Sequence, residues 1–328
     1  MLKKLLVPFL ILALFMVVRC DKDDPTEPDP VDEFKLVADV GDVYFTSYTT
    51  TSGAGVNVAI SAVFDSLMAN SNAYYIIDYR SGTAFADGHI KNAHNFESGL
   101  DELVANMDNG TIPTDKKILN VCYTGQNASA ATALLNLSGY EAYNLLFGMC
   151  AVDVSISGAD KWQTQIAADE RAGDLVATVS TTTTTYDFPT LATGEEEAAE
   201  IMKDTFAASG WTISANDVWD NPANYFIINY WPEADYLNPG HIPGAYQFTP
   251  KASLKYEISL NLLPTDKTIV IYCYTGQTSA QVATYLRMLG YDAKSLLYGV
   301  NGFAYTALAA HKYAGAPTPG IYDAILVK

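Results

Sequence analysis

A five-residue phrase, Cys-Tyr-Thr-Gly-Gln, occurs twice in this chain, at residues 122–126 and 273–277, so its two cysteines lie 151 positions apart. Each copy follows an apolar run rich in β-favouring residues and precedes a small-residue helical pattern that ends in Gly-Tyr. A cysteine at a strand-to-helix turn lies beside the N–H groups and the positive end of the helix, which favour a thiolate over a thiol. Two such turns in register indicate a duplicated unit built around a reactive sulfur.

The duplication extends well beyond the cysteines. Each unit alternates apolar strands with helical patterns, among them residues 56–69 and 195–209 near the two starts. This alternation predicts an α/β fold with a mainly parallel sheet in each unit, and each cysteine at the carboxyl end of a strand, where such sheets bind ligands. The segments that match at the same spacing include residues 112–116 with 263–267, and 145–148 with 296–299.

A run of threonines at residues 181–185 bears on the boundary between the units. A weaker match upstream aligns this run with residues 42–46, a strand-like stretch. Threonine favours strands, so we expect an edge strand there rather than a linker. This interpretation places the boundary near Gly173, with domains over residues 34–173 and 174–328.

Length and charge narrow the function classes. A chain of 328 residues with 49% hydrophobic residues is long and apolar enough for about two packed domains. Its net charge of −18 would repel the phosphates of nucleic acid, so nucleic-acid binding is excluded as a function. His and Cys residues show no metal-ligand spacing, and we expect neither a metal nor a cofactor.

The N-terminus resembles a bacterial lipoprotein signal. Lys3 and Lys4 precede an apolar run over residues 5–18, which is short for a membrane span, and Cys20 follows. We therefore predict a signal peptide over residues 1–19 and a lipid on Cys20. An acidic, proline-rich tether over residues 20–33 would follow. The predicted location is the bacterial cell envelope, as an outer-membrane lipoprotein facing the periplasm or the cell surface; the alternative is an ordinary signal peptide with a bystander cysteine.

Three kinds of motif, taken together, resemble the rhodanese-like sulfurtransferases in their tandem form. The first unit has Ile-Ile-Asp-x-Arg at residues 76–80 and Gly-His-Ile at 88–90, and the second has Gly-His-Ile-Pro-Gly-Ala at 240–245. Both have a Cys-x-x-Gly loop after an apolar strand. The resemblance implies two rhodanese-like domains of α/β class, each a mainly parallel sheet flanked by helices.

The resemblance also implies a double displacement at cysteine. Cys122 and Cys273 would each accept a sulfur atom as a persulfide from thiosulfate, a persulfide or a polysulfide, and pass it to a thiol or cyanide. The partners would be these small molecules, with a membrane contact only through the lipid anchor. The implied substrate-binding loops consist of Tyr123, Thr124, Gly125, Gln126 and Asn127, and of Tyr274, Thr275, Gly276, Gln277 and Thr278.

The loops depart from the family pattern at one position. Many members carry an arginine five residues after the cysteine, but this chain has Asn127 and Thr278 there. Because neither loop contains a positive charge, a less charged donor than thiosulfate suits them better. The related phosphatases use a loop that is one residue longer and ends in arginine; Ala128 and Ser279 occupy that place and argue against phosphatase activity.

Other residues leave alternatives open. Asp78 and Arg80 form an expected charge pair in the first unit, which the second unit lacks. We expect His89 and His241 to orient loops through hydrogen bonds. Cys150 follows a predicted turn and is a hypothetical resolving thiol for Cys122, or a buried bystander. Besides sulfur transfer, the sequence is compatible with a non-catalytic, envelope-tethered binding module or a redox sensor.

The lipoprotein hypothesis makes a direct prediction. When the full-length gene product is expressed in a Gram-negative host, the mature chain should begin at Cys20 and carry a lipid on that residue. Mass spectrometry of the mature N-terminus measures both. An unmodified N-terminus at any residue other than Cys20 would contradict the hypothesis.

Overall fold

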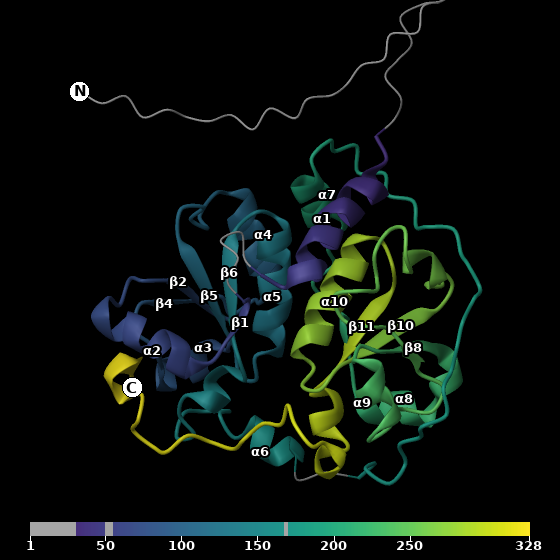
Figure 1. Ribbon diagram of the computed structural model, residues 1–328. Coiled ribbons are helices and arrows are strands. Elements are labelled where there is room, and N and C mark those ends of the chain that lie inside the picture. Colours follow the sequence, from purple (N-terminus) through teal and green to yellow (C-terminus); the bar gives the residue numbers. More distant parts are fainter. Residues whose placement is uncertain (1–30, 50–54, 167–169) are drawn as a thin grey trace, which may run out of the picture. The chain divides into compact units, whose positions relative to one another are not determined.

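Two parallel five-stranded sheets carry the fold (Figure 1). The computed structural model describes residues 31–49, 55–166 and 170–328, so the predicted signal peptide, Cys20 and residues 20–30 lie outside the described residues. The first sheet has the order β1-β6-β5-β2-β4 and the second β7-β11-β10-β8-β9, with every neighbouring pair parallel. Since each strand of one sheet has a counterpart in the other, the predicted α/β class with two parallel sheets is confirmed. The strands are β1 (Asn57–Val58), β2 (Tyr75–Asp78), β4 (Ala93–Asn95), β5 (Lys117–Val121), β6 (Glu141–Leu145), β7 (Thr212–Ile213), β8 (Tyr225–Asn229), β9 (Tyr246–Gln247), β10 (Thr268–Tyr272) and β11 (Ala293–Leu296).

The strands that precede the cysteines, β5 and β10, lie at the centres of the sheets and are buried except at their first residues. The continuous apolar run of β10, Ile269–Tyr272, is typical of a strand covered by helices on both faces of the sheet. The helical patterns predicted over residues 56–69 and 195–209 are found as the shorter helices α2 and α7. Within the described part of the chain, no helix is both long and apolar enough to cross a membrane. The helices are α1 (Glu33–Ser47), α2 (Ile60–Ala69), α3 (Gly82–Asp87), α4 (Leu100–Asp108), α5 (Gln126–Leu137), α6 (Lys161–Ile166), α7 (Ala198–Thr205), α8 (Ala215–Asp220), α9 (Glu233–Leu237) and α10 (Gln277–Met288).

Helices α5 and α10, which begin inside the repeated phrase, lie side by side between the two sheets (Figure 1). Nearly every residue of both helices is buried, and small side chains allow the close approach. Ser129 of α5 donates a hydrogen bond to the Gln277 carbonyl oxygen (2.8 Å) and accepts one from Gln281 Nε2 of α10 (2.8 Å). The two cysteine loops therefore lie next to each other at the same end of this helix pair.

The last two residues of the phrase join the loops reciprocally. Gln126 Oε1 accepts the Tyr298 N–H (2.6 Å), and Gln277 Oε1 accepts the Phe147 N–H (3.2 Å). Gly125 and Gly276 cap the helices with φ of +82° and +74°, and a Cβ on either would lie 2.4 or 2.5 Å from the Oε1 atom of the other copy's glutamine. Only glycine tolerates both the left-handed backbone and this approach.

The two ends of the described chain each contact the other half. Phe34 and Phe45 of α1 pack against Phe188 (ring centroids 4.5 Å apart) and Tyr285 (4.9 Å) of the second half. At the other end, the C-terminal segment returns to the first half, where β12 (Leu326–Val327) pairs antiparallel with β3 (His89–Ile90) (Figure 1). The boundary near Gly173 stays a prediction.

The edge strand predicted over residues 181–185 is wrong. The described chain forms no strand over these residues. Two isolated β-bridges precede the run, one between Val176 and His241 and one between Ser180 and Tyr246. Its presumed counterpart, residues 42–46, lies within α1. The threonines are mostly exposed and bring no apolar face to the sheet, so their β-propensity alone is too weak to form a strand.

The reciprocal contact predicts a stability effect. Gln277→Ala removes the acceptor of the Phe147 N–H and of Asn144 Nδ2 (2.9 Å). We expect the free energy of unfolding to fall by about 1–3 kcal/mol because the Phe147 N–H loses its acceptor and Asn144 Nδ2 keeps only its bond to Asn57 Oδ1. Urea unfolding followed by tryptophan fluorescence measures this change, and truncation of the exposed Glu196 to alanine is the control. Equal unfolding midpoints for the two variants would contradict the structural role of Gln277.

Candidate active site

Cys122 lies between the end of β5 and the start of α5, and its side chain is buried. Its Sγ accepts hydrogen bonds from the N–H groups of Gly125 (3.2 Å) and Ala128 (3.4 Å). Burial nevertheless raises the pKa of the Cys122 thiol, against the opposing effect of the loop N–H groups. The expectation that this turn favours the thiolate is therefore wrong for the unliganded site, because desolvation outweighs the hydrogen bonds.

A cavity of about 390 Å³ opens at Cys122 and takes its walls from both halves of the chain. Most of the predicted first loop lines it, as expected. The second half contributes residues that the sequence did not associate with this cysteine, because only the fold brings them across. The lining residues are, from the first half, Tyr79, Cys122, Tyr123, Thr124, Gln126, Asn127 and Lys161, and from the second, Trp211, Thr212, Leu297 and Tyr298.

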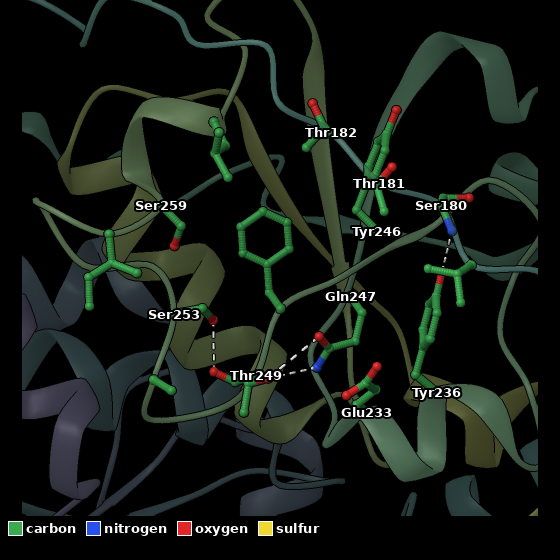
Figure 2. Close-up of a pocket in the computed structure, with 15 residues that line it drawn as sticks. Ser180, Thr181, Thr182, Glu233, Tyr236, Tyr246, Gln247, Thr249, Ser253 and Ser259 are labelled. Atoms are coloured by element: carbon green, nitrogen blue, oxygen red, sulfur yellow. Dashed lines mark hydrogen bonds between the residues drawn. The ribbon is translucent and has the colours of Figure 1, made fainter.

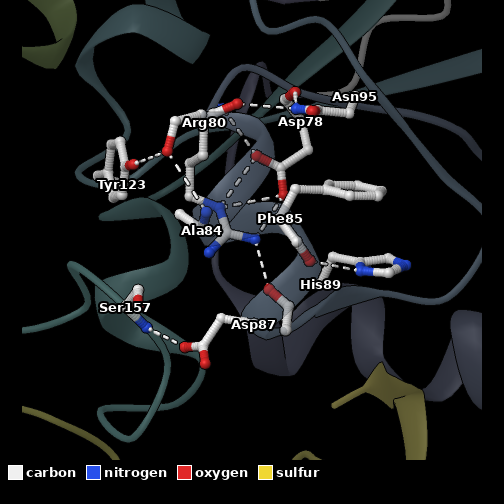
Figure 3. A network of polar contacts seen from close by, with 11 residues as sticks. Asp78, Arg80, Ala84, Phe85, Asp87, His89, Asn95, Tyr123 and Ser157 are labelled. Atoms are coloured by element: carbon white, nitrogen blue, oxygen red, sulfur yellow. Dashed lines mark hydrogen bonds and ion pairs between the residues drawn. The ribbon is translucent and has the colours of Figure 1, made fainter.

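A buried ion pair between Asp78 and Arg80 lies next to the first loop (Figure 3). Arg80 Nη2 lies 2.7 Å from Asp78 Oδ2, both side chains are fully buried, and the same nitrogen donates to the Gly88 carbonyl oxygen (2.6 Å). The Arg80 guanidinium also lies 5.9 Å from the centre of the Tyr123 ring. The predicted charge pair is thus confirmed, and it joins the end of β2 to the turn after α3 and to the active loop.

His89 and His241 form hydrogen bonds with backbone carbonyl groups and do not line the cavity at Cys122. His89 Nδ1 lies 2.8 Å from the Phe85 carbonyl oxygen (Figure 3). His241 Nδ1 lies 2.8 Å from the Tyr236 carbonyl oxygen, and its Nε2 lies 3.0 Å from that of Thr178. The expectation that these histidines orient loops through hydrogen bonds is confirmed.

Helix α6 is attached directly to the first active loop. Trp162 is fully buried, and its Nε1–H donates to the Thr124 carbonyl oxygen (3.1 Å). The preceding residue, Lys161, places its Nζ 4.8 Å from the centre of the Tyr123 ring. We missed both residues in the sequence, although the 151-residue spacing pairs them with Lys312 and Tyr313.

The second cysteine has different surroundings. Cys273 Sγ accepts the Ser279 N–H (3.4 Å), and the thiol lies 3.6 Å from Ser279 Oγ, which is in turn 2.8 Å from Ser295 Oγ. The first copy has Ala128 in place of Ser279. The Cys273 thiol therefore has a side-chain hydroxyl as a hydrogen-bond partner, whereas Ala128 offers Cys122 only its backbone N–H.

The remaining loop residues of the second copy lie around Cys273. Tyr274 donates a hydrogen bond to Asp235 and stacks on Trp231 (4.6 Å between ring centroids). Thr275 and Thr278 are half-buried. A carboxylate and an indole thus contact the second loop tyrosine, where the first copy has two cations.

Cys150 lies next to the first loop and contacts it through its backbone. Its backbone N–H donates to the Tyr123 carbonyl oxygen (3.1 Å), and its thiol lies 3.8 Å from the Gly158 carbonyl oxygen. Burial raises the pKa of the Cys150 thiol to about 11. Its role as a resolving thiol stays a prediction.

A second cavity, of about 400 Å³, lies in the second half and contains no cysteine (Figure 2). Its walls are rich in hydroxyl groups that bond to their own surroundings: Ser253 Oγ donates to the Thr249 carbonyl oxygen (2.8 Å), and Gln247 Nε2 donates to Thr249 Oγ1 (3.0 Å). With Glu233 on its wall, this cavity offers no chemistry for sulfur transfer.

The raised pKa of Cys122 predicts how its reactivity depends on pH. Only the thiolate is alkylated, so the rate at Cys122 should still rise above pH 9.0, the ordinary value of the group. Iodoacetamide labelling between about pH 6 and pH 11, read by peptide mass spectrometry, measures the rate. The alkylation rate of the same cysteine in urea-unfolded protein serves as the control and should level off at a lower pH. The prediction would be contradicted if the rate at Cys122 in the folded protein levelled off at a lower pH than the rate in the unfolded chain.

The chain was compared with curated proteins, solved structures and protein families. No curated protein matches the chain. Among solved structures, a thiosulfate sulfurtransferase from Pseudomonas aeruginosa is 15% identical over 88% of this chain and 49% of its own, with a TM-score of 0.29. A rhodanese-related protein from Thermoplasma volcanium is 19% identical over 30% of this chain and 93% of its own, with a TM-score of 0.26. The rhodanese-like domain family matches residues 62–152 and 214–306, more than half of the 328 residues. The chain therefore belongs to the rhodanese-like family, with two such domains in tandem.

Proposed function

We propose that this protein is a sulfurtransferase that carries sulfur as a persulfide on Cys122. The observation that carries the proposal is the position of Cys122 Sγ at a cavity of about 390 Å³, with the N–H groups of Gly125 and Ala128 on the sulfur. Membership of the rhodanese-like family supports it. A nucleophilic sulfur needs both an opening for the donor and donors for negative charge, and this site has both.

The proposed reaction has two displacements. Cys122 first loses its proton, and the thiolate attacks the outer sulfur of the donor; an S–S bond forms to Cys122 as the donor's own bond to that sulfur breaks, and the remainder leaves with the electron pair. An acceptor thiolate or cyanide then attacks the outer persulfide sulfur, and the electron pair of the broken S–S bond returns to Cys122. The loop N–H groups stabilise negative charge on Cys122 in both steps.

Desolvation of Cys122 bears on the first step. Burial raises the pKa of the Cys122 thiol, so forming the attacking thiolate costs free energy. The persulfide is the more acidic form in the proposed cycle, and its negative charge would face the same N–H groups. The geometry thus supports holding the sulfur-loaded form more strongly than it supports a reactive empty form.

Cys273 is the second proposed carrier of sulfur. It has the same loop, a Gly276 cap and the Ser279 N–H on its sulfur. The Ser279 hydroxyl, which lies 2.8 Å from Ser295 Oγ, gives the Cys273 thiol a side-chain hydrogen-bond partner where the first copy has Ala128. We propose Cys122 as the principal site because the cavity lies against it.

The protein is proposed to act in the bacterial cell envelope, held to the outer membrane by a lipid on Cys20. Lys3 and Lys4, the apolar run over residues 5–18 and the cysteine that follows it at position 20 support this placement. A free thiol in the cell envelope must survive oxidising conditions. Burial of Cys122 and Cys273 limits the access of oxidants to their thiols.

Replacement of the cysteines by serine tests the activity. Transfer from thiosulfate or a small persulfide to cyanide should fall to background in C122S and remain measurable in C273S. Each active variant should gain the mass of one sulfur atom on its remaining loop cysteine after exposure to donor. Full activity in the C122S/C273S double variant would rule out the mechanism.

The same samples separate the alternatives. Wild type that binds donors without turnover would favour the non-catalytic binding module. A Cys122–Cys150 disulfide found by peptide mapping without reductant, after mild oxidation, would favour the redox sensor; no such link would remove the proposed role of Cys150.

A further inference from the structure

We infer that Lys161 is the anion-recognition residue of the Cys122 site and makes it selective for negatively charged sulfur donors. This inference rests on the proposed function, and it deepens it by naming the donor class. It also reverses the sequence-based expectation that a site without a loop arginine would prefer a less charged donor. The cation comes from α6, outside the loop.

The first support is the composition of the cavity wall. Of the eleven described residues that line the cavity, Lys161 is the one with a formal charge. The others are aromatic, apolar or neutral polar side chains and Cys122 itself. In a protein with a net charge of −18, an anionic donor gains its attraction to this cavity from Lys161 and from the loop N–H groups.

The second support is how firmly Lys161 is positioned. Trp162 anchors α6 on the active loop through the Thr124 carbonyl oxygen, and its ring stacks on Tyr313 (5.5 Å, 18°). The preceding turn approaches the loop closely, since a Cβ on Gly158 would lie 2.6 Å from the Tyr123 ring. The backbone of Lys161 is therefore fixed beside the loop, while its exposed side chain remains free to reach a bound ligand.

The third support is the state of the Lys161 charge. In the part of the chain that the structure describes, no carboxylate forms an ion pair with Lys161, and its ammonium instead lies over the Tyr123 ring. The neighbouring Asp160 is exposed and is not among the lining residues of the cavity. The charge is thus not neutralised by a partner before a donor arrives.

The second copy offers a matched comparison. Lys312 stands at the repeat position of Lys161, but its Nζ lies over the Tyr305 ring (4.7 Å). His311 packs against the loop tyrosine Tyr274 instead (4.4 Å between ring centroids), and that tyrosine bonds to Asp235. Equivalent lysines of the two copies therefore have different partners, and only Lys161 lies over the tyrosine of an active loop.

The test compares two alkylating agents that differ in charge, iodoacetate and iodoacetamide. Their rates at Cys122 in the full chain are read by peptide mass spectrometry, so the readout does not require sulfur transfer. In K161Q the ratio of the iodoacetate rate to the iodoacetamide rate should fall about fivefold, and about 1 M salt should remove most of the difference. K161R should keep the wild-type ratio, and K312Q is the matched control that should leave it unchanged.

Two results would overturn the inference: an unchanged ratio in K161Q, or an equal fall in K312Q. A fall confined to K161Q supports it even where no variant transfers sulfur, an outcome that refutes the proposed function alone. Where transfer is observed, K161Q should raise the KM for thiosulfate about fivefold with little change in kcat, and should leave the KM for an uncharged dialkyl trisulfide unchanged.

Discussion

Two glutamine side chains hold the active loops of the two domains together, and the geometry of the site depends on that contact. Gln126 and Gln277 each accept a backbone N–H from the opposite domain, through the space left by a glycine that has no side chain. The contact sets the second domain against the cavity at Cys122, where Trp211 and Tyr298 form part of the wall. The repeated phrase thus serves two purposes, since its cysteine carries the proposed chemistry and its Gly-Gln end joins the domains.

The two sites share a loop and differ in what surrounds it. The tyrosine of the first loop has the guanidinium of Arg80 and the ammonium of Lys161 near its ring, whereas Tyr274 contacts an indole and a carboxylate. These partners come from other elements of each domain, so the loops can stay alike while their electrostatic surroundings diverge. A duplicated domain can keep its backbone chemistry in this way and acquire a second ligand preference through a few neighbouring side chains.

Sequence patterns anticipated the parts of the structure that depend on local spacing. The strands before Cys122 and Cys273, the helices after them and the family were predictable, because alternation and burial of apolar residues repeat at a constant interval. The edge strand over residues 181–185 was not, since threonine propensity cannot form a strand without an apolar face to bury. Lys161 was overlooked although its repeat partner Lys312 is visible in the sequence, because a conserved spacing does not say which ring a lysine will approach.

The sequence by itself determined the number of domains, the α/β class and the two candidate cysteines, since each follows from patterns within a few tens of residues. Only the tertiary structure decided three further properties: the raised pKa of Cys122, the residues of the second domain that line its cavity, and the position of Lys161 in the cavity wall. The physical reason is that desolvation and charge depend on atoms close in space. Tyr298 and Cys122 are 176 positions apart in the chain and meet only because α5 packs against α10.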